Sequence, residues 1–218
     1  MSTAILVDSA FFLKRFRYVY PDHDYKSPAV VADTLYRMSM YHVDDADLYR
    51  VLVYDCPPFM KKSHNPISGQ SVDFSKLPGA AFRVEFHEQL KRKRKVALRL
   101  GYLTGYKWVI KPFATKQLLK GSISHSDLTP LDVEYDINQK GVDMKVGIDI
   151  TSLALKRMVD QIVLVSGDGD FVPAAKLARR EGIDFVLDPM WSQIGDALHE
   201  HIDGLRSTSP RPAGYRTC

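Results

Sequence analysis

The sequence predicts an α/β fold in three layers, with a mostly parallel central sheet between helices on both faces. Short apolar stretches alternate with segments of helical periodicity along the 218 residues. Two of these stretches run directly into aspartates, at Ile5–Asp8 and at Val163–Asp170. Ligands of such folds bind beyond the carboxyl ends of the strands. We therefore expect an acidic site at that edge of the sheet.

The first half of the chain gives three strands and three helices. Apolar runs predict strands at 4–7, 48–54 and 108–110. Helices are expected at 11–20, where aromatic rings alternate with basic residues, at 27–41, where Pro28 suits a first turn, and at 81–100. Segments 59–80 and 113–139 lack clear periodicity and are expected to be long loops.

The second half continues the alternation of helix and strand. Residues 142–158 fit either a strand, by alternation, or a helix, by a face that includes Val146 and Ile150. Strands are expected at 163–165 and 183–187, and helices at 171–181, which Gly182 ends, and 192–201, which Ser192 caps. Residues 206–218 are expected to be a mobile tail.

Charge is distributed unevenly. Residues 88–120 hold ten Lys and Arg against one acid, whereas residues 127–170 hold nine acids against four Lys and Arg. A basic surface beside an acidic pocket suits a metal-dependent enzyme that acts on nucleic acid. We expect the RNA-tracking surface to be Lys91, Arg92, Lys93, Arg94, Lys95 and Arg99. The alternative is that this basic run is merely a solvated face.

Asp168 and Asp170 lie one residue apart after a strand, where close carboxylates repel each other unless a hard cation such as Mg²⁺ or Mn²⁺ offsets the charge. The alternative is that Asp168 is merely a turn residue and Asp170 merely a helix cap. Asp8 has the same two interpretations. The sequence contains no phosphate-binding glycine motif and no Cys/His cluster with zinc spacing. It also offers no evident partner that would make Cys56 a nucleophile.

Three stretches together resemble the NYN family of the PIN-like ribonuclease superfamily. They are Ile5–Asp8, Lys140–Lys145 and Leu164–Phe171, in that order. The resemblance covers roughly residues 3–205. It implies one PIN-like domain over 1–205, a helix at 142–158, and an acidic pocket that binds metal through Asp8, Asp143, Asp168 and Asp170. Asp149 lies in a matching segment and is assigned an outer position. Family members often carry Asn just after the first Asp, where this chain has Ser9.

The resemblance implies hydrolysis of RNA phosphodiester bonds with one or two Mg²⁺ or Mn²⁺ ions. Three residues are expected to support the site: Ser166 by orienting a carboxylate or water, Lys145 by neutralising phosphate, and Ser9 by its hydroxyl. One alternative is a catalytically weak or inactive RNA-binding module. Another is a phosphohydrolase with Asp8 as nucleophile, which the missing Asp-x-Asp disfavours.

The cysteines and the apolar runs indicate where in the cell the protein is expected. Cys56 and Cys218 do not suggest a structural disulfide, the N-terminus lacks a signal-peptide pattern, and no apolar run is long enough to span a membrane. We therefore expect a cytoplasmic protein that does not bind membranes. A homodimer is a further expectation.

Overall fold

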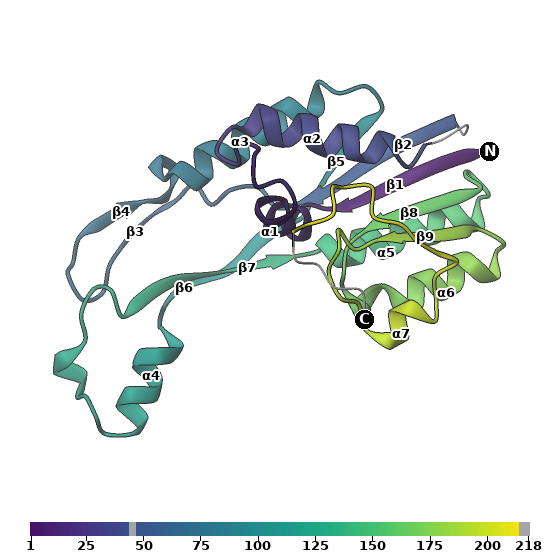
Figure 1. Ribbon diagram of the computed structural model, residues 1–218. Helices are drawn as coiled ribbons and strands as arrows, with labels where there is room; N and C mark the ends of the chain where they lie inside the picture. The colour runs from purple at the N-terminus through teal and green to yellow at the C-terminus, as the bar shows by residue number, and fades with distance from the viewer. Residues whose placement is uncertain (44–46, 214–218) are drawn as a thin grey trace.

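The computed structural model describes residues 1–43 and 47–213. Its centre is a six-stranded sheet in the order β10-β9-β8-β1-β2-β5, with every neighbouring pair parallel. The strands are β1 (Ser2–Asp8), β2 (Asp47–Asp55), β5 (Val96–Leu100), β8 (Gln161–Val165), β9 (Asp184–Asp188) and β10 (Gly204–Leu205). The parallel sheet and its flanking helices (Figure 1) confirm the predicted fold class.

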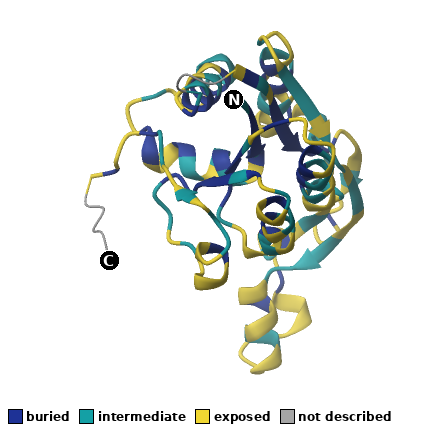
Figure 2. Cartoon of the chain, turned by 90° about the vertical axis from the view of Figure 1, so that its right-hand side faces the viewer, coloured by how far each residue is buried: buried dark blue, intermediate teal, exposed yellow. Residues whose placement is uncertain are grey.

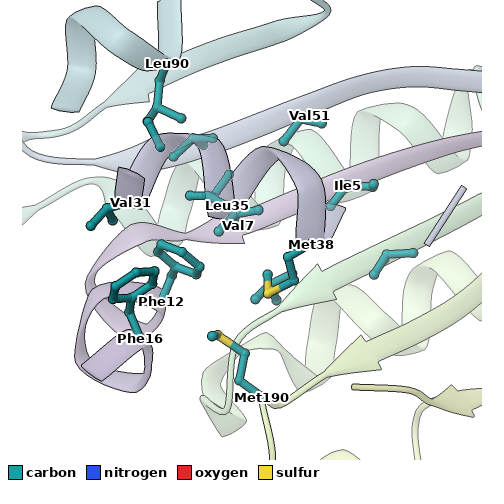
Figure 3. Close-up of a cluster of buried hydrophobic side chains, with 14 of the residues drawn as sticks. Ile5, Val7, Phe12, Phe16, Val31, Leu35, Met38, Val51, Leu90 and Met190 are labelled. Atoms are coloured by element: carbon teal, nitrogen blue, oxygen red, sulfur yellow. The ribbon is translucent and has the colours of Figure 1, made fainter. Parts of the chain in front are cut away.

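Alternate side chains of the central strands enter two separate cores. Ile5 and Val7 face α1 (Ser9–Val19), α2 (Pro28–Met40) and α3 (Pro78–Lys91), where Phe12, Phe16 and Leu35 pack beside them (Figure 3). Ala4 and Leu6 face α5 (Val142–Leu155), α6 (Val172–Arg180) and the short α7 (Asp196–His199). A strand buried on both faces reads as a continuous apolar run, which is why these strands were predictable.

A long arm leaves the sheet at the carboxyl end of β5. Its body is the antiparallel pair β6 (Tyr102–Ile110) and β7 (Val133–Lys140), and α4 (Pro112–Leu119) lies at its tip (Figure 1). The hairpin of β3 (Lys62–His64) and β4 (Ser71–Asp73) lies alongside, joined to the arm by contacts among the rings of Phe59, Phe74 and Tyr135. Most of α4 is exposed to solvent (Figure 2).

The structure of the arm contradicts three predictions. Segment 113–139 contains α4 and β7 rather than a loop alone, and segment 59–80 contains the β3–β4 hairpin and the start of α3. Residues 108–110 belong to β6 of the arm and not to the parallel sheet. Much of both faces of the β6–β7 pair is open to solvent, so these two strands lack the apolar run of a buried strand.

The predicted helix over 81–100 is also wrong in its second half. The helix ends at Lys91, the chain turns through Lys95 in a left-handed conformation (φ 61°), and Val96 begins β5. Val96, Leu98 and Leu100 alternate along that strand, which pairs with β2. The partner strand lies more than forty residues away in the sequence, so local periodicity did not reveal the pairing.

The end of the described chain packs against the fold. The expected helix over 192–201 is reduced to Asp196–His199, and β10 follows it. Residues 206–209, expected to begin a mobile tail, instead make hydrogen bonds. Trp191 donates its backbone N–H to Ser207 Oγ (3.1 Å) and its indole N–H to the Ser209 carbonyl (2.9 Å). Thr208 Oγ1 donates to the Met38 carbonyl at the end of α2 (3.0 Å).

Candidate active site

Asp8 ends β1 and caps α1. One of its carboxylate oxygens, Oδ1, accepts hydrogen bonds from the backbone N–H groups of Ala10 (3.0 Å) and Phe11 (3.2 Å). The capping interpretation is therefore correct for this oxygen. The capping bonds fix the orientation of the carboxylate and leave Oδ2 for another partner.

Asp143 lies in the first turn of α5, next to the base of the arm. The chain reaches it through Gly141, whose positive φ (80°) makes the sharp turn from β7 into the helix. The helix over 142–155 agrees with the segment that the family resemblance implied. Asp143 is exposed, and Lys145 in the same turn donates its ammonium hydrogen to the Leu100 carbonyl.

Asp168 and Asp170 follow β8 in a short 3₁₀ turn over Gly169–Phe171. Asp168 Oδ1 accepts from the Asp170 backbone N–H (3.0 Å), so Asp168 is the cap of this turn. The backbone N–H of Asp168 donates to Ser166 Oγ (3.2 Å), and Ser166 is fully buried. Ser166 thus fixes the backbone of the Asp168 loop, and its role in orienting a carboxylate or water stays a prediction.

Electrostatics connect the carboxylates of these three loops. The pKa of Asp8 is raised, mainly by burial and further by the negative charges of Asp143 and Asp168. The pKa of Asp143 is also raised, first by burial and then by Asp168 and Asp170. The four predicted acids are therefore close enough for their charges to affect Asp8 and Asp143, although they come from distant parts of the sequence. A positive ion between them would relieve this repulsion.

The carboxylate oxygens of these aspartates suit a hard divalent cation, but few of them could bind one ion directly. Within residues 1–43 and 47–213, no three Asp, Glu, His or Cys side chains lie close enough to hold one ion together. Mg²⁺ commonly keeps several waters and takes only one or two protein carboxylates. One or two of the carboxylates of Asp8, Asp143 and Asp168 would fit that mode of binding, with waters completing the shell.

Asp149 does not belong to this cluster. It accepts hydrogen bonds from the Tyr54 hydroxyl (2.8 Å) and from the Arg99 guanidinium (3.0 Å), on the side of α5 that faces β2 and β5. Burial, followed by the Asp149 charge, raises the pKa of Tyr54. The assignment of Asp149 as a possible metal ligand therefore has no support, and Arg99 is bound to a carboxylate rather than directed at a phosphate.

The basic run lies at the opposite edge of the sheet from the acids. Lys95 donates its ammonium hydrogen to the Leu48 carbonyl at the start of β2, whereas Asp8 pairs with Tyr54 near the other end of that strand. Lys91 forms an ion pair with Glu88, and Lys93 with Asp33. Arg92 and Arg94 are exposed on the same turn. Residues 91–95 therefore do not lie beside the acids, and RNA binding by this run stays a prediction.

A buried network surrounds Asp55, the last residue of β2, and was not predicted from the sequence. The Asp55 carboxylate, 2% exposed, accepts hydrogen bonds from Ser9 Oγ (3.1 Å), from His87 Nε2 (2.8 Å) and from the Arg83 guanidinium. The hydroxyl of Ser9 is thus used inside the protein, directly beside Asp8. The one available signal was that Asp55 ends an apolar strand, as Asp8 does.

The chain is similar to proteins found in three comparisons. Residues 72–201 match the NYN domain family. An uncharacterized protein of Methanocaldococcus jannaschii is 27% identical over 105 residues, which cover 48% of this chain and 41% of that protein. The chain thus matches about two fifths of that relative's length.

A crystal structure of a Vibrio parahaemolyticus protein of unknown function aligns over 94% of this chain and 90% of its own, with 17% identity and a TM-score of 0.48. In the described residues, no helix combines the length and the apolar character needed to cross a lipid bilayer.

Proposed function

Because the chain belongs to the NYN domain family, a family of PIN-like nuclease-type domains, we propose that it hydrolyses RNA phosphodiester bonds with the help of a divalent metal. The metal would be held directly by one or two of the carboxylates of Asp8, Asp143 and Asp168 and through waters by the others, with Asp170 contributing charge. One observation carries this proposal. Beyond the effect of burial, the charges of Asp143 and Asp168 raise the pKa of Asp8, and the charges of Asp168 and Asp170 raise the pKa of Asp143, across three separate loops at the carboxyl edge of the sheet.

Each protein group has a defined part in the proposed reaction. When bound, Mg²⁺ or Mn²⁺ lowers the pKa of a water and neutralises charge on the phosphate. Asp8 is oriented by its capping bonds and Asp168 by the Ser166 loop, so neither carboxylate needs to reorganise on substrate binding. Lys145, exposed in the same turn of α5 as Asp143, would contact a phosphate oxygen with the ammonium hydrogens that it does not donate to the Leu100 carbonyl.

The direct test is cleavage of a labelled single-stranded RNA in Mn²⁺ or Mg²⁺. Outer-shell changes at metal sites already cost about 10–100-fold, so Asp168→Asn and Asp143→Asn are each expected to lower the rate by at least about a hundredfold. A chelator is expected to abolish cleavage. Asp22→Asn, which changes an exposed aspartate in the turn after α1, is the matched control and should keep the wild-type rate.

A second candidate function is RNA binding without cleavage. Two observations favour it: no three ligands are already gathered around one point in the described residues, and Ser9 occupies the position where family members often carry Asn. Salt-sensitive RNA binding by a wild-type protein that cleaves in neither metal would select this alternative and reject hydrolysis.

A further inference from the structure

A second candidate binding site lies beside α1, away from the acidic cluster. It is a cavity of about 500 Å³ between α1, the turn that follows it, and the first turns of α2 and α3. Apolar side chains contribute much of its lining, among them Phe16 of α1, Val31 of α2 and Phe82 of α3. This volume and this kind of lining are typical of sites for small organic ligands or for one unit of a polymer.

The rim of the cavity is positively charged. Arg17, Lys26 and Arg83 line it, and no Asp or Glu is among the described residues that do so. The guanidinium carbon of Arg17 lies 4.7 Å from the centre of the Tyr25 ring, and the ammonium of Lys26 lies 5.9 Å from the same centre. Two cations are therefore held around one exposed aromatic ring.

Arg17 and Lys26 differ from four of the basic residues discussed above. Lys91, Lys93, Arg83 and Arg99 each form an ion pair with a carboxylate. Within the part of the chain that the structure describes, Arg17 and Lys26 form no such ion pair. Their charges are thus available to an anionic ligand. An apolar floor, an aromatic ring and free cations together fit a nucleotide, which combines a flat base with a phosphate.

The cavity is connected to the acidic site through one hydrogen-bonded network. Arg83 lines the cavity and donates to Asp55, and Asp55 also accepts from Ser9, the neighbour of Asp8. Along α1, Arg17 lies nine residues beyond Asp8, which corresponds to about 14 Å of helix. At about 3.4 Å per stacked nucleotide, a single strand covers that distance with about four nucleotides, and with fewer when extended.

We propose that this cavity binds one nucleotide of the RNA strand, with the base on the apolar floor beside Tyr25 and the phosphate between Arg17 and Lys26. The identity of the strand as RNA rests on the proposed function. A free nucleoside monophosphate shares the same chemistry, so the test must separate the two sources.

The test measures binding of a fluorescent single-stranded oligoadenylate by anisotropy, with EDTA present so that no cleavage occurs. Arg17→Gln combined with Lys26→Gln is expected to weaken binding by about tenfold and to reduce the salt dependence of log K by about two. Tyr25→Leu is expected to weaken binding by about tenfold with the salt dependence unchanged, because it removes only stacking. Lys156→Gln with Arg157→Gln removes the same charge at exposed positions just after α5 and should change affinity less than about twofold.

Equal weakening by the two double variants, or absence of RNA binding by the wild type, overturns the proposal. Calorimetry with AMP separates the sources: AMP binding that the Arg17/Lys26 variant loses while its RNA affinity stays at the wild-type value assigns the cavity to a free nucleotide and overturns the RNA site. Circular dichroism spectra confirm that each variant is folded. Cleavage is assayed separately, so a failed nuclease proposal leaves the binding difference intact, and the reverse also holds.

Discussion

Asp8 caps a helix with a carboxylate whose surroundings oppose its ionisation. Its capping bonds stabilise the start of α1, while burial and the charges of Asp143 and Asp168 oppose its ionisation. The folded protein therefore holds the Asp8 proton to a higher pH than the unfolded chain does. The Asp8 carboxyl therefore contributes fully to stability below the ordinary aspartate pKa of 3.8. This contribution is lost as pH rises through the raised pKa that Asp8 has in the folded protein.

The variant Asp8→Asn keeps the capping acceptor and removes the charge, since Asn and Asp are similar helix caps. We expect the metal-free variant to melt at a higher temperature than wild type at neutral pH, with no gain below about pH 3.5, and to lose cleavage. Thermal melts across this pH range check the result. Asp8→Ala, which also loses the cap at a cost of about 1 kcal/mol, is the comparison. Equal destabilisation by both variants at neutral pH would argue against electrostatic repulsion at this site.

Asp55 has the opposite pH behaviour. Burial alone would raise its pKa, but the hydrogen bond from His87 and the charge of Arg83 outweigh it, so that the pKa is lowered. Its stabilising contribution is present above the ordinary aspartate pKa and is lost as pH falls through the folded value. Asp55→Ala leaves Arg83 and His87 without their partner, and we expect it to lower the free energy of unfolding by about 3–5 kcal/mol in urea denaturation.

The control for Asp55→Ala is again Asp22→Asn, for which a change within about 0.5 kcal/mol is expected at an exposed site. If Asp55→Ala lowers the free energy of unfolding no more than the control does, the hydrogen bonds around Asp55 do not stabilise the fold.

At the scale of elements, the junction between the sheet and the arm depends on Gly101. A Cβ atom added there would lie 2.5 Å from the Lys140 carbonyl oxygen and 3.0 Å from Cys56 Sγ. We expect Gly101→Ala to push β6 away from the start of α5, destabilise the protein and open the arm to limited proteolysis. Gly147→Ala is the control, because an added Cβ meets nothing within 4 Å in the middle of α5. It should stabilise by about 0.5–1 kcal/mol, and equal protease sensitivity of the two variants would contradict the close approach at Gly101.

The same elements explain what the sequence could and could not predict. β1 and β8 were predictable because burial on both faces leaves an unbroken apolar run, and their terminal aspartates identified the edge of the site. β5 was missed because its pairing with β2 is not local, so the basic run before it was placed on a helix. The Asp55 network was not predictable because it requires α3 to bring Arg83 and His87 back over the end of β2.

At the scale of the whole molecule, the described C-terminal segment connects two elements of the sandwich. Thr208 Oγ1 donates to the Met38 carbonyl at the end of α2 and lies 3.2 Å from His42 Nε2. His42 in turn bonds to Asp188 at the end of β9 (2.8 Å), and both side chains are almost completely buried. The segment therefore completes a buried polar network.

Thr208→Val keeps the shape of the side chain and removes its hydroxyl. Hydrogen bonds of this kind contribute about 1 kcal/mol each, and we expect a loss of about 1–2 kcal/mol. For a chain of this size that corresponds to a fall in Tm of about 2–8 °C, measurable by calorimetry. Thr208→Ser retains the hydroxyl and should recover most of the loss. An unchanged Tm in the valine variant would show that the segment contributes little to stability.

The position of β1 has a consequence for how the protein matures. The first strand synthesised lies between β2 and β8, and its pairing with β8 requires residues beyond 160 to have left the ribosome. Contacts so distant in the sequence make folding slow, because a long loop must close before they form. Asp8 therefore meets Asp143 and Asp168 only when most of the chain has been translated. We infer that a nascent chain carries no assembled acidic site near the messenger RNA being read.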